Sequence, residues 1–249
     1  MKSSKSKLIF YIGAFGMLLF MIGDWLLDAA GAGDEELGLI AHTNWPQMAM
    51  WRFVVSATLA LVALLPVFFA SNEAIRITRE NAALYGTKTG KFWGNTFCLG
   101  HILLMTYGIG FHIILCIYPM FLKTLIAMGI DVQSAADAVN KTGSYTLIQL
   151  MVLYLICDIG VSAAWYYMIF KGKLNLGKWA LLCCPFSTIL IDFPLKMIPL
   201  QFFKDFTVAF ESLGWLLMYL ALARHAGSDV YIGIIKENFS GNLPKRSDL

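Results

Sequence analysis

Charged residues are scarce in this chain of 249 residues. Asp, Glu, Lys and Arg make up 14% of it, whereas they make up about a quarter of an ordinary soluble domain. Hydrophobic residues make up 58%, and the mean hydropathy is +0.67. They form long runs of the length that crosses a hydrocarbon layer of ~30 Å as a helix, without the residue-by-residue alternation of membrane β-barrels. We therefore predict an all-α, polytopic integral membrane protein.

Several chemical signatures are also missing. No dense basic patch accompanies the net charge of +3, so nucleic acid is excluded as an expected partner. The five cysteines lie within hydrophobic runs, and their odd number argues against a disulfide framework. The chain contains no HExxH motif, phosphate-binding loop or recognisable local context of a serine triad. The sequence therefore predicts no metal site and leaves any cofactor unknown.

Hydrophobic segments divide the chain into six predicted transmembrane helices. They are expected at residues 8–30, 47–70, 94–122, 144–170, 178–201 and 205–224. Together they form one predicted bundle over residues 1–225, followed by a polar tail at 226–249. The fifth segment contains Pro185, Pro194 and Pro199, which remove backbone donors and make this segment irregular.

The connections between these segments alternate in charge. Lys and Arg are concentrated before the first segment, in the connections 71–93 and 171–178, and after the sixth segment. The connections 31–46 and 123–143 contain few of them. By the positive-inside rule, both termini lie in the cytoplasm. We expect a multi-pass protein of the cell membrane, with membrane lipids and a lipid or small-molecule substrate as partners, and homo-oligomerisation is left open.

Ionisable side chains within the predicted spans are the candidate functional residues, because each costs about 2.5–3.5 kcal/mol at the bilayer centre on insertion scales. Asp24 and Asp28 lie four residues apart, on one face of the first span. Arg52 lies at a similar depth and is predicted to pair with one of them. His112 and Asp158 are expected deeper. Asp24, Asp28, His112 and Asp158 are the candidate catalytic residues.

A second group of polar residues is assigned to substrate binding. Polar side chains recur every four residues in the fourth span, at Tyr154, Asp158, Ser162 and Tyr166. This stripe should face the interior of the bundle, since lipid would penalise it. Lys196 follows Asp192 by four residues, which is the spacing of a helical ion pair. The candidate substrate-binding residues are Arg52, Asp192, Lys196, Glu211, Ser162 and Tyr154.

Glycines in the first and third spans are expected to let helices approach closely or to leave room for a ligand. They are Gly13, Gly16 and Gly23 in the first span, and Gly94, Gly100, Gly108 and Gly110 in the third.

One segment of the chain resembles a known family. Gly23-Asp24-Trp25-Leu26-Leu27, followed by Glu36-Leu37-Gly38-Leu39-Ile40-Ala41-His42, is similar to the glycine–aspartate segment of lysoplasmalogenase-type membrane hydrolases. The resemblance implies an all-helical protein with intramembrane aspartates, and it assigns a role to Asp24 alone. That family has more spans, and no second segment of this chain matches it.

Three functions follow from these patterns and remain alternatives. The first is a membrane-embedded hydrolase or other enzyme that acts on a lipid or amphiphile through paired carboxylates. The second is a small proton- or cation-coupled transporter, suggested by Asp158 and by the proline-broken fifth span. The third is a non-catalytic binding or assembly protein whose charges only hold helices together. A wet cavity lined by Asp24, Arg52, His112 and Asp158 would favour the first two.

Overall fold

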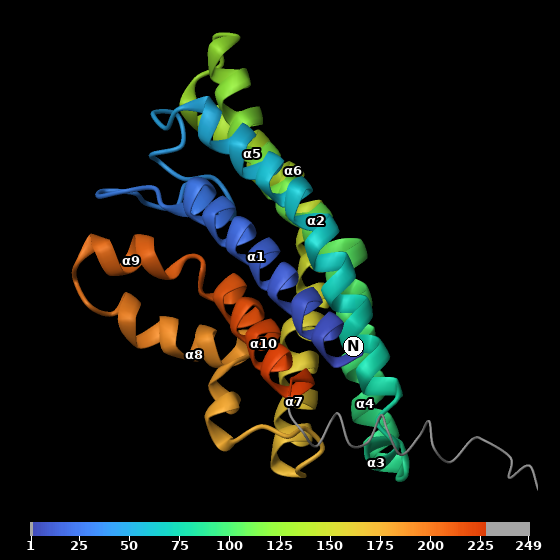
Figure 1. Ribbon diagram of the computed structural model, residues 1–249. Helices are drawn as coiled ribbons and strands as arrows, with labels where there is room; N and C mark the ends of the chain where they lie inside the picture. Colours follow the sequence, from blue (N-terminus) through green and yellow to red (C-terminus); the bar gives the residue numbers. More distant parts are fainter. Residues whose placement is uncertain (1, 228–249) are drawn as a thin grey trace, which may run out of the picture.

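The computed structural model describes residues 2–227 and consists of helices joined by short connections (Figure 1). Within this range the only β-type pairing is an isolated bridge between Glu36 and His42. The α-helices are α1 (Lys2–Asp28), α2 (Met50–Arg79), α3 (Ala82–Tyr85), α4 (Lys88–Leu103), α5 (Ile109–Ala127), α6 (Val132–Tyr154), α7 (Val161–Phe170), α8 (Pro185–Lys196), α9 (Gln201–Thr207) and α10 (Phe210–Ala226). Two π-helical segments, η1 (Leu104–Gly108) and η2 (Leu155–Gly160), and a 3₁₀ helix, η3 (Lys178–Leu182), complete the described chain.

The bundle is built from long rods that run side by side. Helix α4 continues through η1 into α5, and α6 continues through η2 into α7, so each rod contains a π-helical turn in its middle. Helix α1 packs mainly against α2 and α10, and α2 also contacts α4 and α5. Figure 1 shows α1 between α2 and α10, with α8 and α9 beside α10 on the side away from α2. The prediction of an all-helical protein is confirmed.

Small residues allow α1 and α2 to pack closely. A Cβ atom added at Gly13 would lie 2.1 Å from the Cβ of Ala70, and one added at Gly16 would lie 2.8 Å from the Cβ of Pro66. No real Cβ atoms approach so closely, so only glycine fits at these contacts. The predicted role of the glycines in the first span is thus confirmed at these positions, whereas a Cβ added at Gly110 would meet nothing within 4 Å.

Four helical segments in the described chain are long and apolar enough to cross a membrane: Ser4–Asp28, Met50–Arg79, Ile109–Ala127 and Leu147–Phe170. The bent pair α9 and α10, with 52° between the two helices, provides a fifth if it is one span. The structure therefore supports four or five spans where the sequence predicts six.

The predicted fifth span, residues 178–201, is wrong as a single membrane-crossing helix. Its only α-helix, α8, has 12 residues, which reach about 18 Å. Pro185 begins α8 and holds Cys184 in an extended conformation, with φ −155° and ψ 159°, because a residue before proline avoids the helical region. Pro199 lies between α8 and α9. The predicted sixth span is likewise divided between α9 and α10, and the predicted tail lies outside the described residues beyond Gly227.

The connections gather at two opposite ends of the bundle. At one end lies the connection from α1 to α2, residues 29–49, which we name the α1–α2 loop. The backbone N–H of Gly31 in this loop donates to the carboxylate of Asp205 in α9 at 3.3 Å. At the opposite end, which carries α3, the side chain of Asn81 donates to the carbonyl of Lys173 at 2.7 Å. We name these the loop end and the α3 end.

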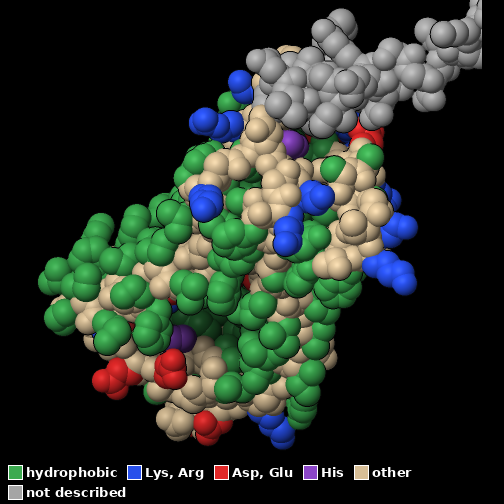
Figure 2. Space-filling model, turned by 90° about the horizontal axis from the view of Figure 1, so that it is seen from below, with side chains coloured by type: hydrophobic (Ala, Val, Ile, Leu, Met, Phe, Trp, Pro, Cys, Tyr) green, Lys and Arg blue, Asp and Glu red, His purple; other side chains and the backbone are tan. Residues whose placement is uncertain are grey.

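Charge differs between the two ends. In Figure 2, most Lys and Arg side chains on the visible face lie in one half, and most Asp and Glu side chains lie in the other, with hydrophobic side chains between them. The helix ends and connections at the α3 end hold Arg76, Arg79, Lys88, Lys91, Lys171, Lys173 and Lys178. The α1–α2 loop holds Asp34, Glu35 and Glu36 and contains neither Lys nor Arg. The predicted alternation of charge therefore corresponds to the two ends of the bundle.

The close approach of α1 and α2 predicts a large difference between two glycine-to-alanine substitutions. We expect Gly13→Ala to lower the free energy of unfolding by about 1–3 kcal/mol, because the new methyl group overlaps that of Ala70. Gly110→Ala should be neutral or stabilising by up to about 1 kcal/mol, since alanine is the better helix former and has open space there. Unfolding of both purified variants in a neutral detergent measures the difference, and equal stabilities would contradict the close packing.

Candidate functional site

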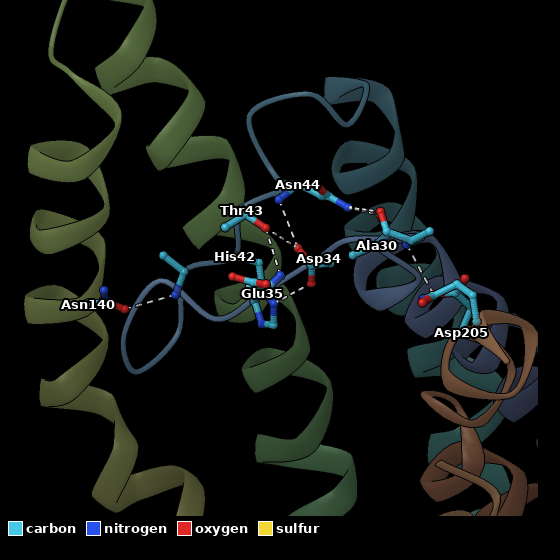
Figure 3. A network of polar contacts seen from close by, with 12 residues as sticks. Ala30, Asp34, Glu35, His42, Thr43, Asn44, Asn140 and Asp205 are labelled. Atoms are coloured by element: carbon cyan, nitrogen blue, oxygen red, sulfur yellow. Dashed lines mark hydrogen bonds and ion pairs between the residues drawn. The ribbon is translucent and has the colours of Figure 1, made fainter. Parts of the chain in front are cut away.

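The α1–α2 loop is held in place by side-chain hydrogen bonds (Figure 3). The carboxylate of Asp34 accepts from the backbone N–H of Asn44 at 3.0 Å and contacts Nδ1 of His42 at 2.7 Å. Asn140 of α6 accepts from the backbone N–H of Ile40 at 2.8 Å. Because these bonds join the loop to itself and to α6, they fix where its side chains stand above the bundle.

Arg52 does not form the ion pair predicted for it. Its guanidinium donates to three backbone carbonyls near the end of α1, those of Trp25 at 3.2 Å, Leu26 at 3.1 Å and Ala29 at 2.7 Å. The last carbonyls of a helix have no partner within the helix, and a cation there is favourable. Arg52 therefore caps the C-terminal end of α1. It holds this end of the helix, which carries Asp24 and Asp28, without contacting their carboxylates.

Asp24 instead contacts His112, from the third predicted span. Oδ1 of Asp24 lies 3.2 Å from Nδ1 of His112, and the hydroxyl of Ser212 in α10 donates to the other carboxylate oxygen. Nε2 of His112 lies 2.9 Å from Oγ of Ser56, which donates its proton to the carbonyl of Gly23 at 2.8 Å. With that proton committed, both ring nitrogens of His112 are donors, and an imidazole with two donors is the cation. Asp24 and His112 form a buried ion pair.

Asp158 lies in η2 and is almost completely buried. Its carboxylate accepts a hydrogen bond from Nε1 of Trp215 in α10 at 2.9 Å. The carboxyl group of Glu211, one turn before Trp215 in α10, lies close enough to that of Asp158 for the two to interact. Two carboxylates at close range repel each other, so a proton bound by one of them stabilises the pair.

The polar stripe of the fourth span faces the interior, as predicted. Oγ of Ser162 accepts from the backbone N–H of Phe186 at 3.1 Å, and the hydroxyl of Tyr166 contacts that of Ser187 at 2.6 Å. These bonds attach α7 to the beginning of α8. Ser162 is thus a structural partner of α8; it lines none of the three hollows described below, and its contact with a substrate stays a prediction.

Lys196 and Asp192 form the ion pair that their spacing predicts, with Nζ and Oδ2 2.7 Å apart. Pro194 lies between them within α8 without preventing the contact. Lys196 is half exposed, and Asp192 is mostly covered. The pair stands at the loop end of the bundle, at the end of α8.

Three neighbouring hollows lie beneath the α1–α2 loop, and Asp28 lines all of them. The mouth, of about 280 Å³, is lined by Asp28, Ala30, His42, Trp45, Lys196 and Val208. The apolar branch, of about 220 Å³, extends between the loop, α5 and α6, and its walls include Leu39, Ile40, Phe111, Leu115, Leu147 and Leu150. The deep chamber, of about 150 Å³, leads inward from Asp28.

The deep chamber brings together the candidate catalytic residues. Its lining includes Asp24, Asp28, Tyr154, Asp158, Glu211 and His112, together with Ser212 and Trp215. Glu211 is exposed to this hollow, although its helix packs within the bundle. Arg52 and Asp192 line none of the three hollows, and their role in substrate binding stays a prediction. Within residues 2–227, no three His, Cys, Asp or Glu side chains gather as ligands of a metal ion.

Three residues of the site have no signal in the sequence. They are buried side chains that contact the ionisable residues: Ser56 contacts His112, Ser212 donates to Asp24, and Trp215 donates to Asp158. A serine or tryptophan within an apolar helix is ordinary packing in most proteins, and helical spacing does not show which spans touch. The contacts of Asp24 and Asp158 with α10 could have been inferred only from the need of a buried carboxylate for donors.

Comparison with known proteins identifies the family of this chain but finds no relative whose activity is established. A search of curated proteins and a search of solved structures each returned no match. One family model matches residues 1–228, and its description is "family of unknown function" (DUF6796). Since the match covers most of the chain, this protein is a member of the DUF6796 family.

Proposed function

We propose that this protein is a membrane-embedded enzyme that performs acid–base chemistry, such as hydrolysis, on a lipid or other amphiphile. One observation carries the proposal. The Asp24–His112 ion pair and the Asp158–Glu211 carboxyl pair line the same deep chamber, which continues into an apolar branch. Concave sites that combine apolar walls with a few convergent polar groups are typical of ligand binding.

The two pairs offer complementary roles in catalysis. The imidazolium of His112 can donate a proton, and Asp24 stabilises its charge and fixes the ring. If Glu211 and Asp158 share one proton, the other wall of the chamber provides both an acid and a base. A scissile bond between the walls would meet a proton donor on one side and a group that activates water on the other.

Ser56 is not assigned as a nucleophile, although it completes a Ser–His–Asp arrangement in space. Its hydroxyl is fully buried and lines none of the three hollows. The hydroxyl already donates to Gly23 and accepts from the thiol of Cys116 at 3.3 Å. A nucleophile must be reachable by the substrate, so we assign Ser56 the role of orienting His112.

The proposed orientation places the mouth outside the cytoplasm, with the protein in the cell membrane. The basic connections at the α3 end would face the cytoplasm under the positive-inside rule, and the acidic α1–α2 loop would face the opposite side. An amphiphile would then enter from the outer leaflet, because the mouth lies at the loop end.

Thiol labelling tests this orientation. Glu35 and Lys88 are exposed at opposite ends, and all five native cysteines are buried. In sealed right-side-out vesicles, a membrane-impermeant maleimide should label Glu35→Cys at once, and Lys88→Cys only after the membrane is permeabilised. Labelling of Lys88→Cys alone in sealed vesicles would reverse the orientation.

The enzyme proposal predicts that both walls of the chamber are needed. We expect Asp24→Asn and Glu211→Gln each to reduce turnover at least about a hundredfold, which is typical for loss of an acid–base group. Turnover is followed by mass spectrometry of a total lipid extract incubated with the purified protein. Asp137→Asn, which removes an exposed carboxylate remote from the hollows, should retain the wild-type rate.

Each variant is compared with the wild type in its unfolding temperature, so that loss of turnover is separated from loss of the fold. Wild-type turnover that survives in both folded variants would remove these residues from the mechanism. An extract that yields no product with the wild type would contradict the enzyme proposal as a whole.

A second function, cation- or proton-coupled transport, is favoured by the closed inner end of the deep chamber. Beyond Trp215, the ring of His101 packs edge-on against Trp215 and contacts Ser71, which in turn contacts Tyr219 at 2.7 Å. A hollow that is lined by carboxylates, open toward one end and closed by packed side chains toward the other is the form of a transporter caught in one of its two states.

Transport is tested in proteoliposomes that contain a pH-sensitive dye. If the second function is correct, a gradient of the transported solute drives proton movement with the wild type, and Asp158→Asn abolishes it because the carboxylate at the inner end of the chamber is lost. Solute-driven proton movement that persists in Asp158→Asn would count against a transporter that uses this chamber.

A further inference from the structure

The charged groups around the mouth differ in whether they have a partner. Lys196 is paired with Asp192 at 2.7 Å, and His42 is paired with Asp34 at 2.7 Å. Asp28 lines the mouth, the apolar branch and the deep chamber, yet within residues 2–227 no hydrogen bond or ion pair to its carboxylate is formed. Positive groups nearby, among them Lys196 and Arg52, act on this carboxylate at longer range without contacting it.

The position of Asp28 follows from the geometry of α1. It is the last residue of the helix, one turn beyond Asp24, and Arg52 caps the same helix end through backbone carbonyls. A carboxylate near the C-terminus of a helix gains nothing from the helix dipole, which favours cations there. A negative side chain kept at this point, exposed to the hollows and with no cation in direct contact among the described residues, is therefore suited to a positive group from outside the chain.

Aromatic residues stand next to this carboxylate. The rings of His42 and Trp45 pack with centroids 5.1 Å apart, and both residues line the mouth and the apolar branch together with Asp28. Indole rings attract cations, including quaternary ammonium groups. A carboxylate beside a tryptophan thus recognises an amine or an ammonium better than an anion or a neutral hydroxyl group.

The apolar branch begins at the same junction. Its walls are aliphatic and aromatic, with Leu39 and Ile40 from the α1–α2 loop on one side and Leu147 and Leu150 of α6 on the other. An alkyl chain entering there would be removed from water or from the head-group layer. The junction thus places a charged recognition point at the opening of an alkyl-sized hollow.

We infer that the cleft binds a cationic amphiphile, with an amine or quaternary ammonium group at Asp28 and an alkyl chain in the apolar branch. This inference rests on the proposed function insofar as the same cleft is the active site, and it names the class of substrate. The bond that reacts would lie toward Asp24 and His112, within the deep chamber.

Binding of matched probes tests the inference without any turnover. Decyltrimethylammonium, decyl sulfate and decyl glucoside share one chain and differ in the charge of the head group. Each is titrated against purified protein in a maltoside detergent, and binding is followed by Trp fluorescence and by the shift in unfolding temperature. We expect decyltrimethylammonium to bind the wild type about tenfold more tightly than either other probe, as one favourable charge contact provides.

Two substitutions test whether the preference for the ammonium probe depends on Asp28. Asp28→Asn keeps the size of the side chain and should bring the three affinities within about twofold of one another. Asp137→Asn removes one carboxylate at the loop end outside the hollows and should leave the tenfold preference intact. A preference that survives in Asp28→Asn, or a wild type that binds the three probes equally, would overturn the inference.

The outcome is separable from that of the proposed function. A cation preference that depends on Asp28, found in a protein without turnover of lipid extract, would keep the binding site and remove the enzyme. Turnover that depends on Asp24 and Glu211 without any preference for the ammonium probe would keep the enzyme and remove the assignment of a cationic substrate.

Discussion

The contact between Asp24 and His112 is the interaction on which the interior of this protein depends. It joins α1 to α5, and through the hydroxyl of Ser212 it also joins α10. Removing one partner of a buried ion pair costs about 3–5 kcal/mol, because the other charge is left without compensation. Helices α1, α5 and α10, which line part of the deep chamber, are thus held together by the same groups that we propose for its chemistry.

Both glycines and polar side chains position the helices around this pair. Gly13 and Gly16 allow α1 to lie directly against α2, and Arg52 closes the end of α1. Both arrangements fix the depth and rotation of the helix that carries Asp24 and Asp28. On the opposite wall, Trp215 holds Asp158 within a π-helical segment, a distortion that occurs frequently at functional sites.

Much of the candidate site could be predicted from the sequence, and the errors have a common cause. Asp24, His112, Asp158 and Glu211 were identified because charge within an apolar helix is costly wherever the helix packs. Arg52 was assigned to a carboxylate, but it binds backbone carbonyls at the end of α1. Depth alone does not distinguish these acceptors, since carboxylate and carbonyl oxygens both accept hydrogen bonds from a guanidinium and lie at the same level.

The sequence by itself determined the helical class, the segregation of basic connections to one end and the candidate ionisable residues, because these depend on local hydrophobicity and on the cost of buried charge. Only the tertiary structure decided which helices meet, that the proline-rich segment forms the short helix α8, and that Asp28 stands unpaired where three hollows join. Helical periodicity fixes which face of a segment is polar, whereas the choice of its partner follows from how all the helices fit together.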